Sequence, residues 1–262
     1  MDYSYKEVDK ALGNRISAHA KYSNFNLHEW LSDKFLIKSS DNILDLGCGD
    51  GNFISLFWDA IKPHGKLHGI DINEDLIRIA KDKHQSLSRN ISLSVEDFDD
   101  FSSLGLKYDW IFSIYSIYYT QNPENLIDNL YKNMNDNAKF VITGPSSKNA
   151  LELDNINLAV TGKKRNIEDI RRMHRIEEDF LSIFVKIFGK DKISLEFVDT
   201  KMSFPNAEEF AVYYWSTLLW RESTSELKDE DILKMKTKTV EVIKQMPESV
   251  LNKQMSCLVG SK

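Results

Sequence analysis

Two repeating patterns of apolar and polar residues alternate along the chain. Short apolar runs bounded by Gly, Pro or Asp predict buried strands, and the segments between them place apolar residues at the three- and four-residue intervals of amphipathic helices. Strands are expected at residues 43–46, 66–72, 91–95, 110–114, 138–143, 193–204 and 253–259. Strands that alternate with helices predict an α/β fold: a doubly wound, mostly parallel sheet with helices on both faces.

Helices are predicted from the same periodicity on both sides of these strands. The segment 15–25 is polar and aromatic, and we expect a connector there between two N-terminal helices. Residues 146–190 are too long for an ordinary connection and have a helical pattern, so they predict a helical insert. The expected helices span residues 3–16, 26–35, 52–61, 74–84, 123–134, 206–220 and 229–245.

A glycine loop follows the first strand and supplies the first chemical indication. Gly47, Gly49 and Gly51 alternate between the strand and the next helix, and Asp45 stands two residues before the first glycine. Backbone N–H groups at such a helix start favour binding of an anionic group, whereas the Asp45 carboxylate favours binding of an ammonium group. The spacing therefore suits a zwitterionic amino-acid moiety better than the pyrophosphate of a dinucleotide. A glycine turn that serves only packing is the alternative.

Residues 43–51 resemble the first motif of the class I S-adenosylmethionine (SAM)-dependent methyltransferases. The resemblance implies SAM as cofactor, S-adenosylhomocysteine as product, and a seventh strand that lies antiparallel between strands five and six. It also implies one methyltransferase domain over residues 1–262. Its parts would be an N-terminal helical lid (1–41), a SAM-binding core (42–145), a substrate-capping insert (146–190) and C-terminal strands and helices (191–262). The implied cofactor residues of the loop are Asp45, Gly47, Cys48, Gly49 and Asn52.

Acidic residues after the second and third strands extend this resemblance. Asp71 ends the second strand about 20 residues past the loop, where a carboxylate can accept hydrogen bonds from both ribose hydroxyls. Ile72 follows it. By resemblance, Asp97 receives the adenine amino group and the Phe98 backbone meets a ring nitrogen, although 96–100 could be only an acidic loop. Enzymes that bind NAD share an acidic residue at the position of Asp71, so only the first motif distinguishes SAM-dependent methyltransferases from NAD enzymes.

Other residues of the cofactor site are expected at the fourth strand and near the N-terminus. Ser113, at the carboxyl end of the fourth strand, is expected beside the methionine half. Arg15 and Tyr22 are candidates for the cofactor carboxylate by resemblance, or else a surface arginine and a packed tyrosine.

Candidates for acceptor binding and catalysis are more scattered. Six basic residues gather within 163–175, which indicates an anionic partner or a solvated helix face. Aromatic rings after the fourth strand and in the helix after the sixth could contact the acceptor or simply pack. The substrate-binding candidates are Tyr115, Tyr118, Tyr119, Arg171, Arg175 and Tyr214. The catalytic candidates are His174, as a general base for a hydroxyl, and also Tyr118 and His19.

Composition narrows the partners. The formal net charge of −6 argues against a protein devoted to nucleic acid. Cys48 and Cys257 lack metal-ligand spacing, and no His or Asp cluster indicates a metal. Since no signal peptide or membrane-spanning run is apparent, we expect a cytoplasmic protein without membrane contact. We expect it to be a monomer or a homodimer.

The sequence therefore predicts methyl transfer to an O, N or C atom of a small-molecule acceptor, and an anionic acceptor is among the candidates. Alignment of the reactants would be the main catalytic effect. Alternatives are a methyltransferase of tRNA or of a carrier-protein-bound intermediate, a non-catalytic SAM-binding partner protein and, more distantly, an NAD-dependent dehydrogenase.

Overall fold

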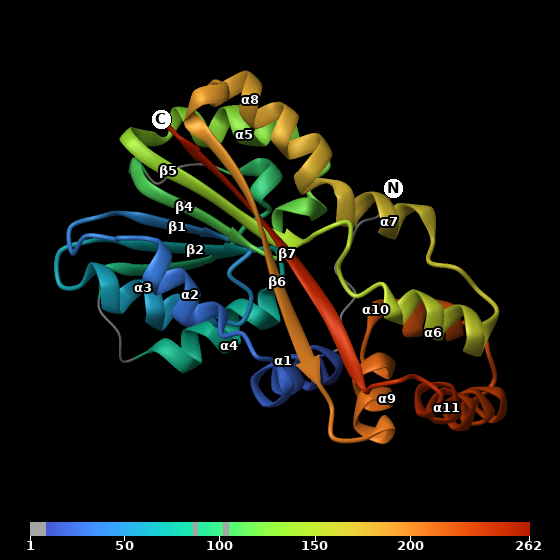
Figure 1. The fold of residues 1–262 in the computed structure, drawn as a ribbon. Coiled ribbons are helices and arrows are strands. Elements are labelled where there is room, and N and C mark those ends of the chain that lie inside the picture. Colours follow the sequence, from blue (N-terminus) through green and yellow to red (C-terminus); the bar gives the residue numbers. More distant parts are fainter. Residues whose placement is uncertain (1–8, 86–88, 102–104) are drawn as a thin grey trace. The chain divides into compact units, whose positions relative to one another are not determined.

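The computed structural model describes residues 9–85, 89–101 and 105–262. Its seven strands form one sheet in the order β3-β2-β1-β4-β5-β7-β6 (Figure 1). Strand β7 runs antiparallel to β5, with Phe140 opposite Gly260, and this confirms the predicted fold class. The strands are β1 (Ile43–Leu46), β2 (Leu67–Asp71), β3 (Ile91–Val95), β4 (Tyr108–Ile114), β5 (Met134–Pro145), β6 (Ile193–Ser203) and β7 (Val250–Ser261).

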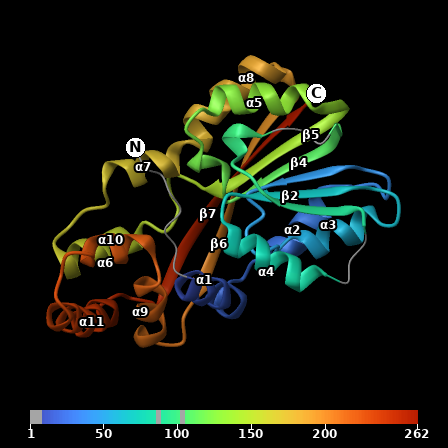
Figure 2. The same cartoon turned by 180° about the vertical axis from the view of Figure 1, so that it is seen from behind.

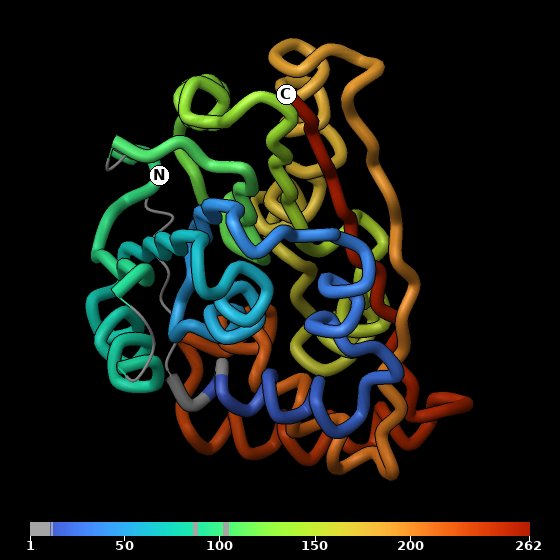
Figure 3. The backbone as a smooth tube through the Cα atoms, turned by 90° about the vertical axis from the view of Figure 1, so that its left-hand side faces the viewer, coloured from blue at the N-terminus to red at the C-terminus, as the bar shows by residue number. Residues whose placement is uncertain are grey.

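The helices follow the expected order with small changes of boundary. They are α1 (Asp9–Tyr22), α2 (Leu27–Lys34), α3 (Ile54–Ile61), α4 (Glu74–His84), α5 (Pro123–Lys132), α6 (Glu152–Thr161), α7 (Ile167–His174), α8 (Leu181–Phe188), α9 (Ala207–Trp215), α10 (Leu218–Thr224) and α11 (Asp229–Lys244). Short helices are η1 (Phe98–Asp100), η2 (Ile117–Tyr119), the π-helical η3 (Ile176–Phe180) and η4 (Lys190–Lys192). The predicted helical insert between β5 and β6 is confirmed; Figure 3 follows its course.

Two local predictions were wrong. The expected connector at 15–25 is mostly helix, because α1 continues through Tyr22. The expected single helix at 206–220 is broken, because Thr217 is extended and its side chain accepts a hydrogen bond from Trp220 N, which starts α10. The residues before position 9, on which part of the first predicted helix rested, lie outside the described residues.

The chain divides into two compact units, each with its own core. The sheet unit comprises Leu27–Ser147, Arg172–Val198 and Met255–Lys262. The helical unit comprises Met1–Asn26, Lys148–Arg171 and Asp199–Gln254.

In the sheet unit, successive strand residues point to opposite faces, and each face carries a separate apolar core. Ile43 and Phe112 pack with α2 and α3, whereas Leu44 and Phe140 pack with α5 and α8. Figure 2 shows α5 and α8 on one side of the sheet and α2, α3 and α4 on the other. Both faces of β1 and β4 are therefore buried, which leaves the strand ends as the place for a site.

The helical unit has an aromatic core formed mainly by α6, α9 and α10. Phe210 and Tyr214 are completely buried, and Tyr214 contacts Trp220 edge-on with ring centroids 5.3 Å apart. Aromatic side chains of the segment expected as one helix at 206–220 thus pack in the core of this unit. No helix in the described part of the chain is long and apolar enough to cross a bilayer.

Candidate cofactor and acceptor site

The carboxyl ends of the central strands meet at one edge of the sheet unit. Parallel pairing places Asp45 of β1 opposite Gly69 of β2 and Phe112 of β4. Polar residues that end these strands therefore lie side by side, as in other open α/β sheets that bind ligands at this edge.

The glycine loop after β1 has a backbone that only glycine accommodates well. Gly47 has a φ of +71°, and a Cβ at this position would lie 2.3 Å from Ser116 Cβ. Its N–H and that of Cys48 both donate to Ile70 O, at 2.8 and 2.9 Å. Gly49 has a φ of +55° and open space where its Cβ would be. The loop is thus tied to β2 through Gly47 and Cys48, and it is open at Gly49.

Asp71, at the end of β2, is held by the same loop. Its carboxylate accepts hydrogen bonds from Gly49 N and Asn73 N, each 2.9 Å long. Burial raises the pKa of Asp71, and the two backbone hydrogen bonds partly oppose this. A carboxylate oxygen can accept more than one hydrogen bond, so the group can also receive ribose hydroxyls.

Asp45 is a buried carboxylate that lacks a complete set of partners. It is 1% exposed, and its Oδ2 atom has no hydrogen-bond partner in the described part of the chain. Burial, followed by the charge of Asp71, raises the pKa of Asp45 to about 7. Such an oxygen is costly unless a donor meets it. The residues present therefore fit a ligand with an ammonium group beside the loop.

Two histidines that the sequence analysis did not assign to the site support the loop. His28 Nε2 lies 3.0 Å from Asn52 O, and its ring stacks on Phe53 at 4.5 Å. His84 Nε2 lies 2.9 Å from Gly51 O. Both rings reach the loop from helices distant in sequence, α2 and α4, so no local pattern could have predicted these contacts.

In the turn after β3, the acidic residue Asp97 caps the start of the short helix η1. Asp97 accepts a hydrogen bond of 2.9 Å from Asp99 N and begins η1. Large apolar side chains are exposed at the neighbouring strand ends, with Ile72 at 59% and Val95 at 49%. The face of a flat aromatic ring such as adenine could cover such side chains, and the adenine roles of Asp97 and Phe98 stay predictions.

The exit loop, defined as residues 115–121 after β4, begins on a buried serine pair. Ser113 Oγ lies 2.6 Å from Ser116 Oγ and accepts a hydrogen bond of 3.0 Å from Ile117 N. Ser113 is fully buried and its side chain supports the loop, and its expected place beside the methionine half stays a prediction. Tyr115 is the first residue beyond β4, with a φ of +57° and 41% exposure. The backbone at Tyr115 is therefore strained, and the ring that it carries is partly exposed just beyond β4.

The other two tyrosines of the exit loop are more enclosed. Tyr118 is 7% exposed, and its ring lies where a Cβ at Gly144 would be, 2.8 Å from Cε1. Tyr119 lies beneath the Arg172 guanidinium, 5.2 Å from its ring centroid. Packing is therefore the described role of Tyr118, and its roles toward substrate or as a catalyst stay predictions.

The basic cluster of the insert is mostly occupied by contacts within the chain. Arg165 pairs with Asp154 at 2.8 Å, and Lys163 Nζ donates to Ser223 O at 2.9 Å. Arg175 donates to backbone carbonyls of the exit loop. His174 lies 3.2 Å from Glu178 on the surface of its helix. Arg171 is exposed, and it remains a predicted acceptor contact.

The remaining candidates lie in the helical unit. Arg15 Nη1 donates to Ser216 O at 3.3 Å, and the Tyr22 hydroxyl donates to Glu209 at 2.8 Å. Burial, with the charges of Lys253 and Arg15, lowers the pKa of His19 to about 3, which makes it a weak base. Tyr214 is fully buried and donates to Asn157 Oδ1 at 2.7 Å, a placement that does not support contact with substrate.

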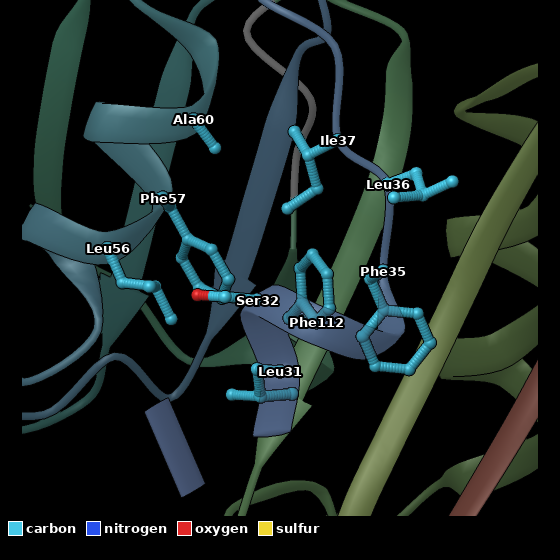
Figure 4. A pocket seen from close by; sticks show the side chains of 9 residues that line it. All are labelled: Leu31, Ser32, Phe35, Leu36, Ile37, Leu56, Phe57, Ala60 and Phe112. Atoms are coloured by element: carbon cyan, nitrogen blue, oxygen red, sulfur yellow. The ribbon is translucent and has the colours of Figure 1, made fainter. Parts of the chain in front are cut away.

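A cavity of about 170 Å³ lies elsewhere in the sheet unit, between α2, α3 and β4 (Figure 4). Its lining is apolar apart from Ser32, so it offers no group for acid–base chemistry. Among the described residues, no group of three or more His, Cys, Asp or Glu side chains could hold a metal ion.

Comparison with known proteins identifies the family and agrees with the fold. Residues 37–189, more than half of the 262-residue chain, match a family model described as a methyltransferase domain. A SAM-dependent methyltransferase from Thiobacillus denitrificans, solved with S-adenosylhomocysteine, shares the fold with a TM-score of 0.57 at 15% identity; the match covers 98% of this chain and 100% of that one.

Two curated relatives are similar over part of their length. One is a malonyl-[acyl-carrier protein] O-methyltransferase of Ilyobacter polytropus, 31% identical over 130 residues, or 48% of each chain. The other is a juvenile hormone acid O-methyltransferase of Bombyx mori, 30% identical over 108 residues, or 40% of this chain and 38% of that one. The chain thus spans half or less of these two relatives. With the family model matched over most of the sheet unit, the chain belongs to the class I SAM-dependent methyltransferases.

Proposed function

We propose that the protein transfers the methyl group of SAM to an oxygen of a small-molecule carboxylate. The observation that carries the cofactor half is the buried, incompletely bonded carboxylate of Asp45 beside the open backbone at Gly49. An ammonium group would satisfy Asp45 Oδ2 there. Asp71 would accept the ribose hydroxyls, and Asp97 and Phe98 would receive adenine beside the exposed Ile72.

The roles of this chain in the reaction are alignment and exclusion of water. Bound SAM supplies a methyl carbon made electrophilic by a positively charged sulfur. Tyr115 stands at the carboxyl end of β4 on a strained backbone, so its exposed ring is suited to orient an acceptor. Proximity and orientation can account for most of the rate enhancement of such a displacement.

A carboxylate also removes the need for a general base, because it is already ionised at neutral pH. This fits the pKa of about 3 for His19 and the surface pairing of His174 with Glu178. The two curated relatives described above are named for methylation of a malonyl group and of an acid, both at oxygen.

The direct test is an acceptor scan with methyl-labelled SAM. Each carboxylic acid in the panel should be paired with its amide and its alcohol, and only the acid is expected to accept label. Transfer to alcohols or amines alone would overturn the carboxylate assignment. Label in tRNA or in an acyl carrier protein would favour those alternatives, and SAM affinity without transfer to anything would favour a non-catalytic binding protein. NAD binding without SAM binding, measured by calorimetry, would overturn the whole proposal.

A further inference from the structure

The insert contains one turn of π-helix, at the point where it reaches the strand ends. Phe180 N donates to Arg175 O at 2.8 Å, a bond between residues five apart, at the start of η3 (Ile176–Phe180). Such turns insert one extra residue into a helix and often occur at functional sites. Here Arg175 reaches the exit loop after β4, and Glu177 reaches β7 and the segment after β5.

Glu177 fixes the turn to the segment that follows β5 and to the middle of β7. Its carboxylate accepts hydrogen bonds from Ser147 N at 2.7 Å, Ser147 Oγ at 2.8 Å and Ser256 Oγ at 3.0 Å. Three donors on one carboxylate form a strong local anchor, because each bond is charge-assisted. The backbone that carries Arg175 is therefore held in place relative to the sheet.

Arg175 reaches from this anchor to the exit loop. Its Nη1 atom donates to both Tyr118 O and Thr120 O, each at 2.8 Å. The side chain is 14% exposed, pairs with Asp179 at 3.3 Å, and lies over the Phe180 ring. Contacts with the chain itself therefore occupy the guanidinium, which makes a direct contact with substrate the poorer interpretation of this residue.

The exit loop is held from its other side by Asp99 of η1. The carboxylate of Asp99 accepts hydrogen bonds from Gln121 N, at 2.8 Å, and from the Thr120 hydroxyl. Its own N–H donates to Asp97. The loop thus forms a hydrogen-bonded bridge from the turn proposed to bind adenine to the insert. Thr120 is held by both Asp99 and Arg175.

We propose that Arg175 is a positioning residue for methyl transfer: it fixes the exit-loop backbone, against Asp99, in the conformation that presents Tyr115 to the acceptor. Arg175 acts on the acceptor half of the site. The glycine loop meets the exit loop through Ser116, whereas Arg175 holds Tyr118 O and Thr120 O, so the affinity for SAM should depend little on Arg175. The kinetic part of this inference rests on the proposed function, whereas the structural part does not.

The test compares R175M and R175K with the wild-type chain and with R78M. Arg78 is a matched control in the same unit: it is exposed on α4 and pairs with Asp75 at 3.0 Å. Three quantities are measured: the affinity for S-adenosylhomocysteine by calorimetry, hydrogen exchange of the peptide that covers 115–121, and kcat and KM for the acceptor found in the scan.

In R175M, exchange in the exit loop should accelerate about tenfold, the effect of losing one to two charge-assisted hydrogen bonds. Affinity for S-adenosylhomocysteine should stay within about twofold, while kcat falls on the order of 100-fold through misplacement of the acceptor. R175K should recover part of kcat, because an ammonium group can still meet a carbonyl. R78M should match the wild type in all three. D99N removes the support of the exit loop on its other side. It should also accelerate hydrogen exchange in residues 115–121, while the contacts of the insert stay as they are in the wild type.

Wild-type loop exchange and wild-type kcat in R175M would overturn the inference. A parallel loss of S-adenosylhomocysteine affinity and thermal stability, without rescue by R175K, would also overturn it, since that pattern describes a merely structural arginine. If no acceptor is found, the proposed function fails, but the exchange and affinity measurements still decide whether Arg175 positions the loop.

Discussion

The glycine loop after β1 and the exit loop after β4 are neighbours at one sheet edge, yet they are held in different ways. The glycine loop is fixed by backbone conformation and by close partners on the adjacent strand, such as Ile70 O and Asp71. The exit loop is fixed by side chains that arrive from 21 to 57 residues away, Asp99 and Arg175. The glycines and acids of the first arrangement belong to a local motif and to the end of the next strand, whereas Arg175 lies 55 and 57 residues from the two carbonyls that it meets, so only the folded chain places it.

The largest effect is expected from Gly47→Ala. The new Cβ would lie 2.3 Å from Ser116 Cβ, at a φ of +71°, so the glycine loop and the base of the exit loop must both shift. We expect loss of S-adenosylhomocysteine binding and a fall of about 2–4 kcal/mol in the free energy of unfolding, from overpacking and left-handed strain together.

Gly49→Ala is the matched control for this change. Gly49 also has a positive φ but has open space around its Cβ position, so only strain of about 1–2 kcal/mol should appear. Denaturant unfolding and calorimetry would measure both variants. Equal losses of stability in the two would mean that the contact with Ser116 does not matter, and that the two loops are independent.

Asp45→Asn should separate binding from stability on the cofactor side. The variant cannot form an ion pair with an ammonium group, and SAM affinity should fall on the order of 100-fold. The ligand-free protein should nevertheless unfold at a higher temperature above pH 7, because an ionised carboxylate no longer has to be buried. Unchanged SAM affinity would remove Asp45 from the site.

The raised pKa of Asp45 also predicts a pH dependence of SAM binding. Ligand-free Asp45 is protonated below about pH 7, and binding of an ammonium group favours the ionised form. Affinity should therefore rise as the pH increases from 5 to 7, by up to about tenfold per pH unit, and then level off. Calorimetry in buffers of different ionisation enthalpy would detect the released proton near pH 6. Asp45→Asn should abolish the proton release; a release that persists would assign it to another group.

The difference between the two loops explains how far the sequence could be interpreted. Apolar runs such as 110–114 and the alternation of strands with helices predicted the sheet, including the antiparallel last strand through the family resemblance. The left-handed turn at Gly47 and the positions of Asp45 and Asp71 near the ends of β1 and β2 were predictable from the glycine spacing and the strand pattern. The fully buried side chains of Ser113 and Tyr214 were not, because burial depends on the packing of distant elements.

Arg175 illustrates the same limit. Its sequence neighbours are basic, and a basic cluster predicts a surface that attracts anions. Its contacts are two carbonyls more than 50 residues away, together with a π-helical turn that hydrophobic periodicity does not distinguish from an ordinary helix. The contacts of His28 and His84 with the glycine loop were missed for the same reason.

The smallest effect is expected from Tyr115→Asn, and it tests whether the exit loop is strained for function. Tyrosine at a φ of +57° costs about 1 kcal/mol relative to a residue that tolerates left-handed backbone, and asparagine is such a residue. The chain already places Asn137 at a φ of +65°. The variant should therefore be about as stable as the wild type or slightly more so, with a Tm higher by up to about 2–4 °C. Its affinity for S-adenosylhomocysteine should be unchanged and its kcat/KM for the acceptor lower. A clear loss of stability with transfer intact would instead make Tyr115 a packing residue, and the exposed ring would have no part in presenting the acceptor.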